Sequence, residues 1–196
     1  MIISFLASHG GSSARALIKA MQDGAIPARP GIVITNNRDS GIFHWCLDHD
    51  IPVRHISAKT HRGEENADEA IADVLREAGT TLVVCSGYMK KVGPCVLAAF
   101  PRHVLNIHPA LLPAHGGKGM YGDHVHSAVL TAGESHSGAT VHVVTTGIDE
   151  GPIVLQRAVP VLPNDSLDEL RARVQAIEPQ LYIDAVQLFM QRHHAM

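Results

Sequence analysis

The sequence predicts an α/β protein built on a doubly wound, mostly parallel sheet with an antiparallel C-terminal extension. Through the first hundred residues, short apolar runs rich in Val and Ile alternate with amphipathic segments of helical periodicity. This alternation is typical of parallel strands joined by crossover helices. Two extended runs joined by turn-forming residues follow, and a long helical pattern comes last. At 196 residues, the chain is long enough for one domain with a full core.

Strands and helices alternate in the predicted parallel part. Apolar runs predict strands at residues 1–7, 31–35, 51–56, 81–85 and 103–108. Apolar residues at helical spacing predict a first helix at residues 14–21, with Ser12 or Ser13 as its N-cap. A second, short helix is expected after Asp39 or Ser40. Two more helices are predicted at residues 62–78 and 94–100.

The last third of the chain has a different pattern. Residues 137–145 and 153–161 are extended, and the turn-forming residues 147–152 between them predict an antiparallel pair. Residues 167–190 are predicted to be helical, with a start signal at residues 164–166. Pro179 is expected to kink this helix or to split it in two.

Composition favours an intracellular protein that acts on small molecules. A net charge of -3 supplies neither a basic footprint for nucleic acid nor a basic patch for a membrane. The apolar N-terminus lacks a basic region, so we interpret it as a first strand and not as a signal peptide. Cys46, Cys85 and Cys95 have unrelated spacings, and we expect reduced thiols in a cytoplasmic protein.

The segment Val104 to Pro113 carries the strongest functional signal. Asn106 and His108 lie two residues apart, so they leave the same face of the strand. Pro109 ends the strand and places both side chains at its carboxyl end, where open α/β sheets bind ligands. An amide beside an imidazole suits acyl chemistry. The alternative is that Asn106 caps the strand end and His108 is a satisfied core histidine.

Two glycine-containing segments are further candidates. Residues 8–13 follow a strand and open a helix, and backbone N–H groups at such a position bind phosphate. No full G-x-G-x-x-G and no P-loop Lys is present, which disfavours NAD and ATP. Asp149 would raise the pKa of His108 and orient it if the two side chains meet. The alternative for residues 8–13 is an ordinary glycine turn with a Ser cap. The alternative for Asp149 is a residue that only shapes its turn.

Two more loops could border the same site. The loop at residues 85–90 ends the fourth strand, and Met89, Val92 and Leu97 either form an apolar slot for a flat ring or belong to the core. The loop at residues 113–126 contains four glycines and three histidines, and we expect a mobile lid. Its histidines match no zinc spacing, so no metal site is predicted.

With these segments together, the sequence resembles the glycinamide ribonucleotide formyltransferases of purine synthesis, which use 10-formyltetrahydrofolate. The resemblance runs nearly end to end, and its most specific part is Asn-Ile-His-Pro-Ala-Leu-Leu-Pro at residues 106–113 followed by Asp-Glu-Gly-Pro at residues 149–152. These motifs specify folate-dependent formyl transfer more strongly than they specify the acceptor. The resemblance implies a single formyltransferase domain over residues 1–196. Residues 1–103 would form the nucleotide- and phosphate-binding half, and residues 104–196 the catalytic and folate-binding half.

The family implies a role for each matching position. Asn106 and an imidazolium at His108 would stabilise the oxyanion, and Asp149 would hold His108 and relay a proton through water. The acceptor would be bound at its phosphate by Gly11, Ser12 and Ser13 and at its ribose by Glu178. The folate-binding residues would be Met89, Lys90, Val92, Leu97, Thr145, Thr146, Gly147 and Ile148.

Some positions depart from the family pattern. The usual Gly-x-Gly-Ser-Asn turn is His-Gly-Gly-Ser-Ser at residues 9–13, and Ala110 replaces a common Ser. The acceptor is therefore less determined than the reaction. The alternatives are another acceptor, water as in a formyltetrahydrofolate hydrolase, and a non-catalytic folate- or nucleotide-binding module. We expect small-molecule substrates, no nucleic acid, no membrane, and a monomer or homodimer.

Overall fold

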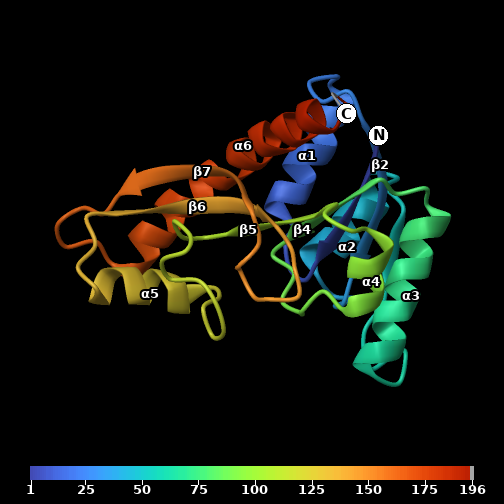
Figure 1. Ribbon diagram of the computed structural model, residues 1–196, viewed down its shortest axis with the longest axis horizontal. Coiled ribbons are helices and arrows are strands. Elements are labelled where there is room, and N and C mark those ends of the chain that lie inside the picture. Colours follow the sequence, from blue (N-terminus) through green and yellow to red (C-terminus); the bar gives the residue numbers. More distant parts are fainter. Residues whose placement is uncertain (195–196) are drawn as a thin grey trace. The chain divides into compact units, whose positions relative to one another are not determined.

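The computed structural model describes residues 1–194 and shows strands and helices alternating along the chain (Figure 1). The strands are β1 (Ile2–Ala7), β2 (Arg29–Thr35), β3 (Val53–His55), β4 (Leu82–Ser86), β5 (Val104–His108), β6 (His136–Val143) and β7 (Ile153–Pro160). The helices are α1 (Ser12–Gln22), α2 (Gly41–Asp48), α3 (Glu64–Glu77), α4 (Pro94–Ala99), α5 (Asp123–Thr131) and α6 (Leu167–His194).

The sheet has seven strands in the order β3-β2-β1-β4-β5-β6-β7. β1 pairs in parallel with β2 and with β4, and β2 pairs in parallel with β3. β6 and β7 pair in antiparallel fashion. The predicted fold class, a mostly parallel sheet with an antiparallel C-terminal extension, is therefore confirmed. Internal contacts divide the chain into two compact units, Met1–Leu105 and Asn106–Met196.

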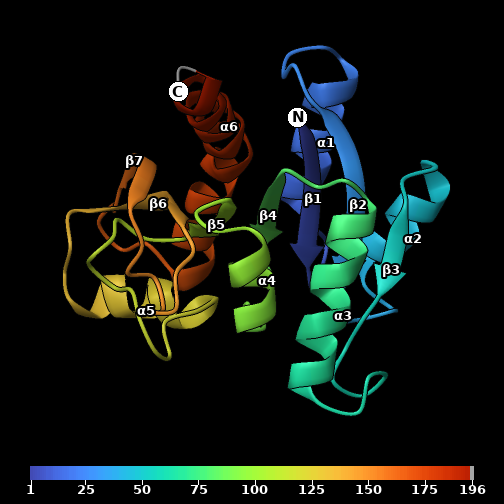
Figure 2. The same cartoon turned by 45° about the vertical axis from the view of Figure 1, so that its right-hand side comes forward.

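The first unit is a small parallel sheet with a buried apolar centre. Ile3, Phe5 and Leu6 of β1 are fully buried, and every residue of β4 is buried. Strands with both faces covered have such continuous apolar runs. α1 packs against β2 and β4, while α3 contacts α4, and Figure 2 shows α1 and α3 on opposite faces of these strands.

The predicted start of α2 is confirmed, whereas the predicted N-cap of α1 is not. Ser40 is the N-cap of α2 and accepts a hydrogen bond from the N–H of Phe43. The expectation that Ser12 or Ser13 caps α1 is wrong, because Gly11 is the N-cap and Ser12 is already helical. Gly11 adopts a left-handed conformation with φ 61°, which glycine reaches without strain.

The second unit joins the antiparallel pair β6–β7 to the long helix α6, which packs against both strands (Figure 1). Ser166 and Glu169 form a capping box, since each side chain accepts the backbone N–H of the other. Pro179 lies inside α6 without dividing it into two helices. α5 was not predicted, and its first turn lies in the segment that the sequence suggested to be a loop, residues 113–126.

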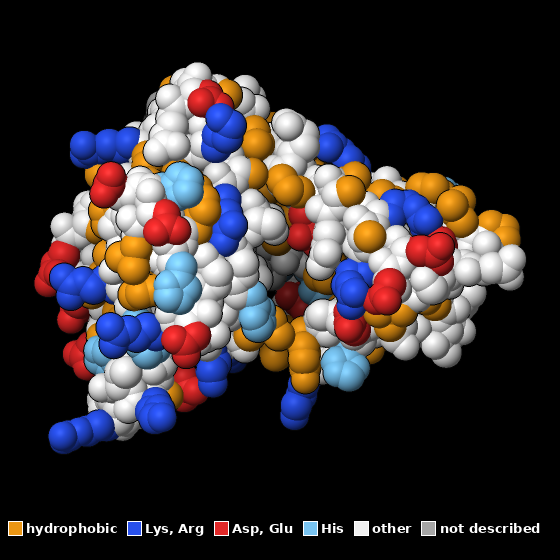
Figure 3. Space-filling model, turned by 180° about the vertical axis from the view of Figure 1, so that it is seen from behind, with side chains coloured by type: hydrophobic (Ala, Val, Ile, Leu, Met, Phe, Trp, Pro, Cys, Tyr) orange, Lys and Arg blue, Asp and Glu red, His pale blue; other side chains and the backbone are white. Residues whose placement is uncertain are grey.

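Basic and acidic side chains are interspersed over the face of the molecule shown in Figure 3. Neither sign of charge forms a continuous area on that face, in keeping with the small net charge of -3. In the part of the chain that the structure describes, no helix combines the length and apolarity needed to cross a bilayer.

Candidate active site

The carboxyl end of β5 presents two polar side chains, as the alternation of the strand predicts. Asn106 is part-buried and His108 is buried. The chain after the strand is fixed by Thr140 of β6, whose hydroxyl donates to the carbonyl of Ala110 at 2.6 Å and accepts from the N–H of Leu112 at 3.0 Å. β6 therefore positions the segment that follows the two candidate residues.

Asp149 lies beside His108, although forty residues separate them in the sequence. Its Oδ2 atom is 3.4 Å from Nδ1 of His108, and the two side chains are 10% and 4% exposed. The same carboxylate oxygen accepts the N–H of Gly117 at 3.2 Å. The structure thus brings together the imidazole and the carboxylate that the sequence singled out.

The loop before β7 can place Asp149 beside His108 because its backbone passes close to the end of β6. Asp149 itself has a left-handed backbone with φ 57°, a conformation that Asp tolerates better than most residues. A Cβ atom on Gly151 would overlap the carbonyl oxygen of Val143, so only glycine fits at that position. The turn residues noted in the sequence therefore serve to position the carboxylate.

His142 is a member of this cluster that the sequence analysis missed. Its Nε2 atom lies 3.2 Å from Nδ2 of Asn106 and 3.5 Å from Oδ1 of Asp149. Its Nδ1 atom faces the carbonyl of Val143 at 3.2 Å, so Nδ1 carries a proton, and Nε2 can pair with either the Asn106 amide or the Asp149 carboxylate. The second Nδ2 hydrogen of Asn106 is then left for a substrate. The alternation of β6 could have signalled this residue only if its pairing with β5 were known.

The loop after β5 also reaches His108. Nε2 of His108 lies 2.8 Å from the backbone carbonyl of His115, and a carbonyl only accepts, so this nitrogen is protonated. His115 has a left-handed backbone with φ 54°. The imidazole proton that could reach a substrate is therefore engaged by the glycine- and histidine-rich loop in this conformation. That the loop acts as a lid stays a prediction.

Burial controls the charge of this cluster. It lowers the pKa of His108 below 6.5, and the nearby Asp149 charge and His115 carbonyl, which favour the cation, do not outweigh it. Asp149 does raise the pKa of His108, as expected, but burial outweighs this contribution. Burial acts against the ionised Asp149 as well, but the hydrogen bond to His142 and the His108 charge outweigh it and keep its pKa low. The resting cluster thus holds a carboxylate beside an imidazole that burial makes harder to protonate.

The candidate acceptor-binding residues lie at two helices. Gly11, Ser12 and Ser13 form the start of α1, where backbone N–H groups without intrahelical acceptors are found. Glu178 lies in α6, part-buried, and its carboxyl group makes no hydrogen bond or ion pair with another residue in the described range 1–194. Burial raises the pKa of Glu178 to about 7. A carboxyl group without a protein partner remains available to a ligand.

The candidate folate residues of the first unit differ in burial. Val92 is buried, Leu97 is part-buried, and Met89 is 46% exposed and is not a core residue. Lys90 forms an ion pair with Glu64 at 3.0 Å. The carboxylate of Asp68 fixes this segment, because it accepts the N–H of Cys95 in the first turn of α4.

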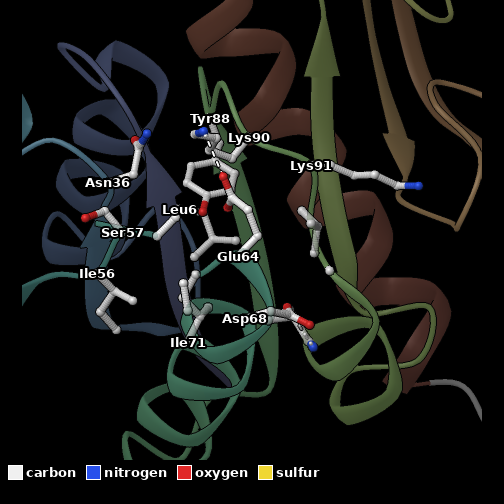
Figure 4. A pocket seen from close by; sticks show the side chains of 15 residues that line it. Leu6, Asn36, Ile56, Ser57, Glu64, Asp68, Ile71, Tyr88, Lys90 and Lys91 are labelled. Carbon is white, nitrogen blue, oxygen red and sulfur yellow. Dashed lines mark hydrogen bonds and ion pairs between the residues drawn. The ribbon is translucent and has the colours of Figure 1, made fainter. Parts of the chain in front are cut away.

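A small open pocket, with about 30 Å³ accessible to a water-sized molecule, lies next to this segment (Figure 4). Lys90 and Val92 line it, together with Tyr88, Asn36 and the face of α3 that carries Glu64. Burial raises the pKa of the Tyr88 hydroxyl, so it stays protonated and can donate. The pocket therefore combines apolar side chains with several polar and charged groups.

The remaining folate candidates lie in the loop of the second unit that carries Asp149. Ile148 is 43% exposed and Thr146 is exposed, whereas Thr145 and Gly147 are part-buried.

Within residues 1–194, no group of three or more His, Cys, Asp or Glu side chains is arranged to hold a metal ion.

Comparison with known proteins identifies relatives over nearly the whole chain. The family model described as "Formyl transferase" matches residues 1–186. The chain is 39% identical over 185 residues to the chloroplastic phosphoribosylglycinamide formyltransferase of Arabidopsis thaliana, covering 94% of this chain and 63% of the relative. It thus spans less than two thirds of that relative's length.

Bacterial relatives are similar in both sequence and structure. Identity to the phosphoribosylglycinamide formyltransferase of Haemophilus influenzae is 36% over 180 residues, covering 92% of this chain and 82% of the relative. The crystal structure of glycinamide ribonucleotide transformylase 1 from Symbiobacterium toebii superposes with a TM-score of 0.91 at 36% identity, covering 97% of this chain and 88% of that one. The chain therefore belongs to the formyl transferase family.

Proposed function

We propose that this protein transfers the formyl group of 10-formyltetrahydrofolate to the primary amine of glycinamide ribonucleotide, a step of de novo purine biosynthesis. The observation that carries the proposal is the cluster of Asn106, His108 and Asp149 in a member of this family, with Nδ1 of His108 3.4 Å from the carboxylate. The names of the plant and bacterial relatives support the acceptor.

The reaction needs no covalent enzyme intermediate. The acceptor nitrogen attacks the formyl carbon, and a C–N bond forms while the carbonyl oxygen becomes an oxyanion. The free N–H of Asn106 and the N–H on Nε2 of His108 would donate to that oxygen once His108 leaves the carbonyl of His115. The bond from the formyl carbon to the folate nitrogen then breaks.

Proton transfer would complete the exchange. The attacking amine loses a proton and the departing folate nitrogen gains one, so the products are the formylated acceptor and tetrahydrofolate. Asp149 is ionised in the resting cluster, because its pKa lies below the ordinary value. It would accept the amine proton through water and pass it to the folate nitrogen. His108 would assist, because the developing oxyanion favours the protonated form of its imidazole.

The substrates would be held by the remaining candidate residues. Gly11, Ser12 and Ser13 would bind the acceptor phosphate, and Glu178 would accept hydrogen bonds from its ribose. The folate would lie against Met89, Lys90, Val92 and Leu97 and the loop at residues 145–148. A cytoplasmic location and a monomeric or homodimeric state stay predictions.

An assay of folate deformylation with and without glycinamide ribonucleotide tests the proposal. We expect turnover only when the acceptor is present, with the formylated acceptor as product. Turnover without acceptor would instead indicate a hydrolase, and tight folate binding without any formylation would indicate a binding module. Either result would contradict the proposed transfer.

Asn106→Ala tests the mechanism separately. One oxyanion donor is typically worth about 3 kcal/mol, so turnover should fall about a hundredfold while thermal unfolding stays unchanged. Asn66→Ala is a matched control, because Asn66 lies exposed on α3 and bonds only to the carbonyl of His61. Equal turnover in both variants would remove Asn106 from the mechanism.

A further inference from the structure

The side chain of Arg15 lies beside the Gly-Ser turn at the start of α1. Helical side chains lean towards the N-terminus of their helix, and Arg15 stands one turn after Gly11, whose carbonyl accepts its N–H at 2.9 Å. Nη2 of Arg15 is 3.3 Å from the position that a Cβ atom on Gly41 would take, and that position is 3.6 Å from Cα of Gly10. The guanidinium therefore lies where the turn meets the start of α2.

Arg15 has no protein partner for its charge within residues 1–194. Its Nε atom is buried without a hydrogen-bond partner, and the side chain forms no ion pair with any described carboxylate. Its guanidinium carbon lies 5.4 Å from the centroid of the Trp45 ring, which supports the cation without neutralising it. By contrast, Arg157 and Arg173 are paired with Asp184 and Asp165. Because no described carboxylate offsets it, the guanidinium keeps its charge and its terminal N–H groups for an anion.

The turn beside this cation carries free backbone donors. The N–H of Ala14 is taken by Ser86 at 3.1 Å, whereas those of Ser12 and Ser13, in the first helical turn, have no intrahelical acceptor. No acidic side chain lies in the first turn of α1. Space above Gly10 is open, since a Cβ atom there would meet nothing within 4 Å. An anion at this turn would meet N–H groups and the positive end of the helix together with a guanidinium.

We propose that Arg15 supplies the fixed positive charge that binds the acceptor's phosphate, and so makes the protein select a phosphorylated acceptor over its dephosphorylated form. The inference rests on the proposed function and names the residue on which acceptor selection depends. A phosphate monoester suits the site, because a guanidinium and backbone N–H groups are both good partners for its oxygens.

Steady-state kinetics of Arg15→Met with both acceptors test this inference. Met keeps an unbranched apolar side chain at this position and removes the charge, together with the guanidinium contact with Trp45. We expect KM for glycinamide ribonucleotide to rise at least about tenfold, with kcat and the KM for the folate little changed. The kcat/KM for the dephosphorylated acceptor should not change. Lys19→Met is the control, since Lys19 lies on the same helix, exposed and paired with Asp23.

A loss of equal size with both acceptors, or no loss at all, would overturn the assignment. Arg15→Lys should recover part of the affinity, because it restores charge without the planar fork. A structural role of Arg15 would give no such recovery and no dependence on the phosphate.

Binding of inorganic phosphate separates this inference from the proposed reaction. In the wild-type protein, phosphate should shift the NMR signals of the Arg15 Nε–H and of the amides at residues 11–13. Arg15→Met should abolish the amide shifts at the same phosphate concentration. This result would support Arg15 even if the acceptor amine were a different one. Wild-type spectra without any shift at Arg15 would overturn the inference, whether or not the variant folds.

Discussion

Replacing Glu178 with Gln should stabilise the protein at alkaline pH and not at acidic pH. Burial raises the pKa of Glu178 from 4.5 to about 7, so the native state keeps a proton that the unfolded chain releases above pH 4.5. The native state binds more protons between these values, and its stability therefore falls as pH rises through this window. The full loss is present above about pH 7.

The size of the effect follows from the two pKa values. At about 1.4 kcal/mol for each pH unit between 4.5 and 7, the loss would be at most about 3 kcal/mol. Glu178 is part-buried, and solvent screening reduces the expected loss of stability to about 1.5 kcal/mol. Glu178→Gln removes the titration. The difference in unfolding free energy between the variant and wild type should therefore be about 1.5 kcal/mol larger at pH 8 than at pH 5.

Urea unfolding of both proteins at pH 5, 6, 7 and 8 measures this difference. Glu77→Gln serves as a control for the change of charge, because Glu77 is exposed at the end of α3. A Glu178→Gln difference that is the same at pH 5 and pH 8 would refute the reasoning. It would show that the carboxyl group is solvated in the native state.

The same titration predicts proton release on acceptor binding. In the proposed complex, ribose hydroxyls would donate hydrogen bonds to the ionised form of Glu178 and lower its pKa, so binding near pH 7 should release a proton. Calorimetry in buffers of different ionisation enthalpy measures the number of protons. Release that persists in Glu178→Gln would assign the proton to another group.

Two further predictions concern the histidines. His142→Phe removes the ring nitrogen that contacts Asn106, and we expect kcat to fall about tenfold or more with KM values near wild type. His142→Gln should recover part of this loss. A wild-type kcat in the Phe variant would contradict the prediction. Burial lowers the pKa of both His108 and His126, so the stability that they contribute is complete above pH 6.5 and is lost as pH falls through their native values. Urea unfolding in the Glu178→Gln background, which removes the opposing titration, should show this fall, and a flat profile below pH 6.5 would count against it.

Local patterns in the sequence were enough to predict most of the fold. The alternation of β5 placed Asn106 and His108 on one face, and Pro109 marked the end of the strand. Ser40 gave a correct helix start because its cap involves only the next few residues. α5 was missed because its apolar residues, Val125 and Val129, form a short stripe among glycines and histidines. Its burial comes from the second unit, where α5 contacts α6.

The sequence by itself determined the order of the strands and of every helix but α5, the face shared by Asn106 and His108, and the resemblance that names a formyl donor. Only the tertiary structure decided that His142 joins the cluster and that His115 holds the proton of His108. It also decided the direction of the His108 pKa, which the proximity of a carboxylate alone would have reversed. Desolvation depends on atoms from many distant segments, whereas strand alternation depends on neighbours in the chain.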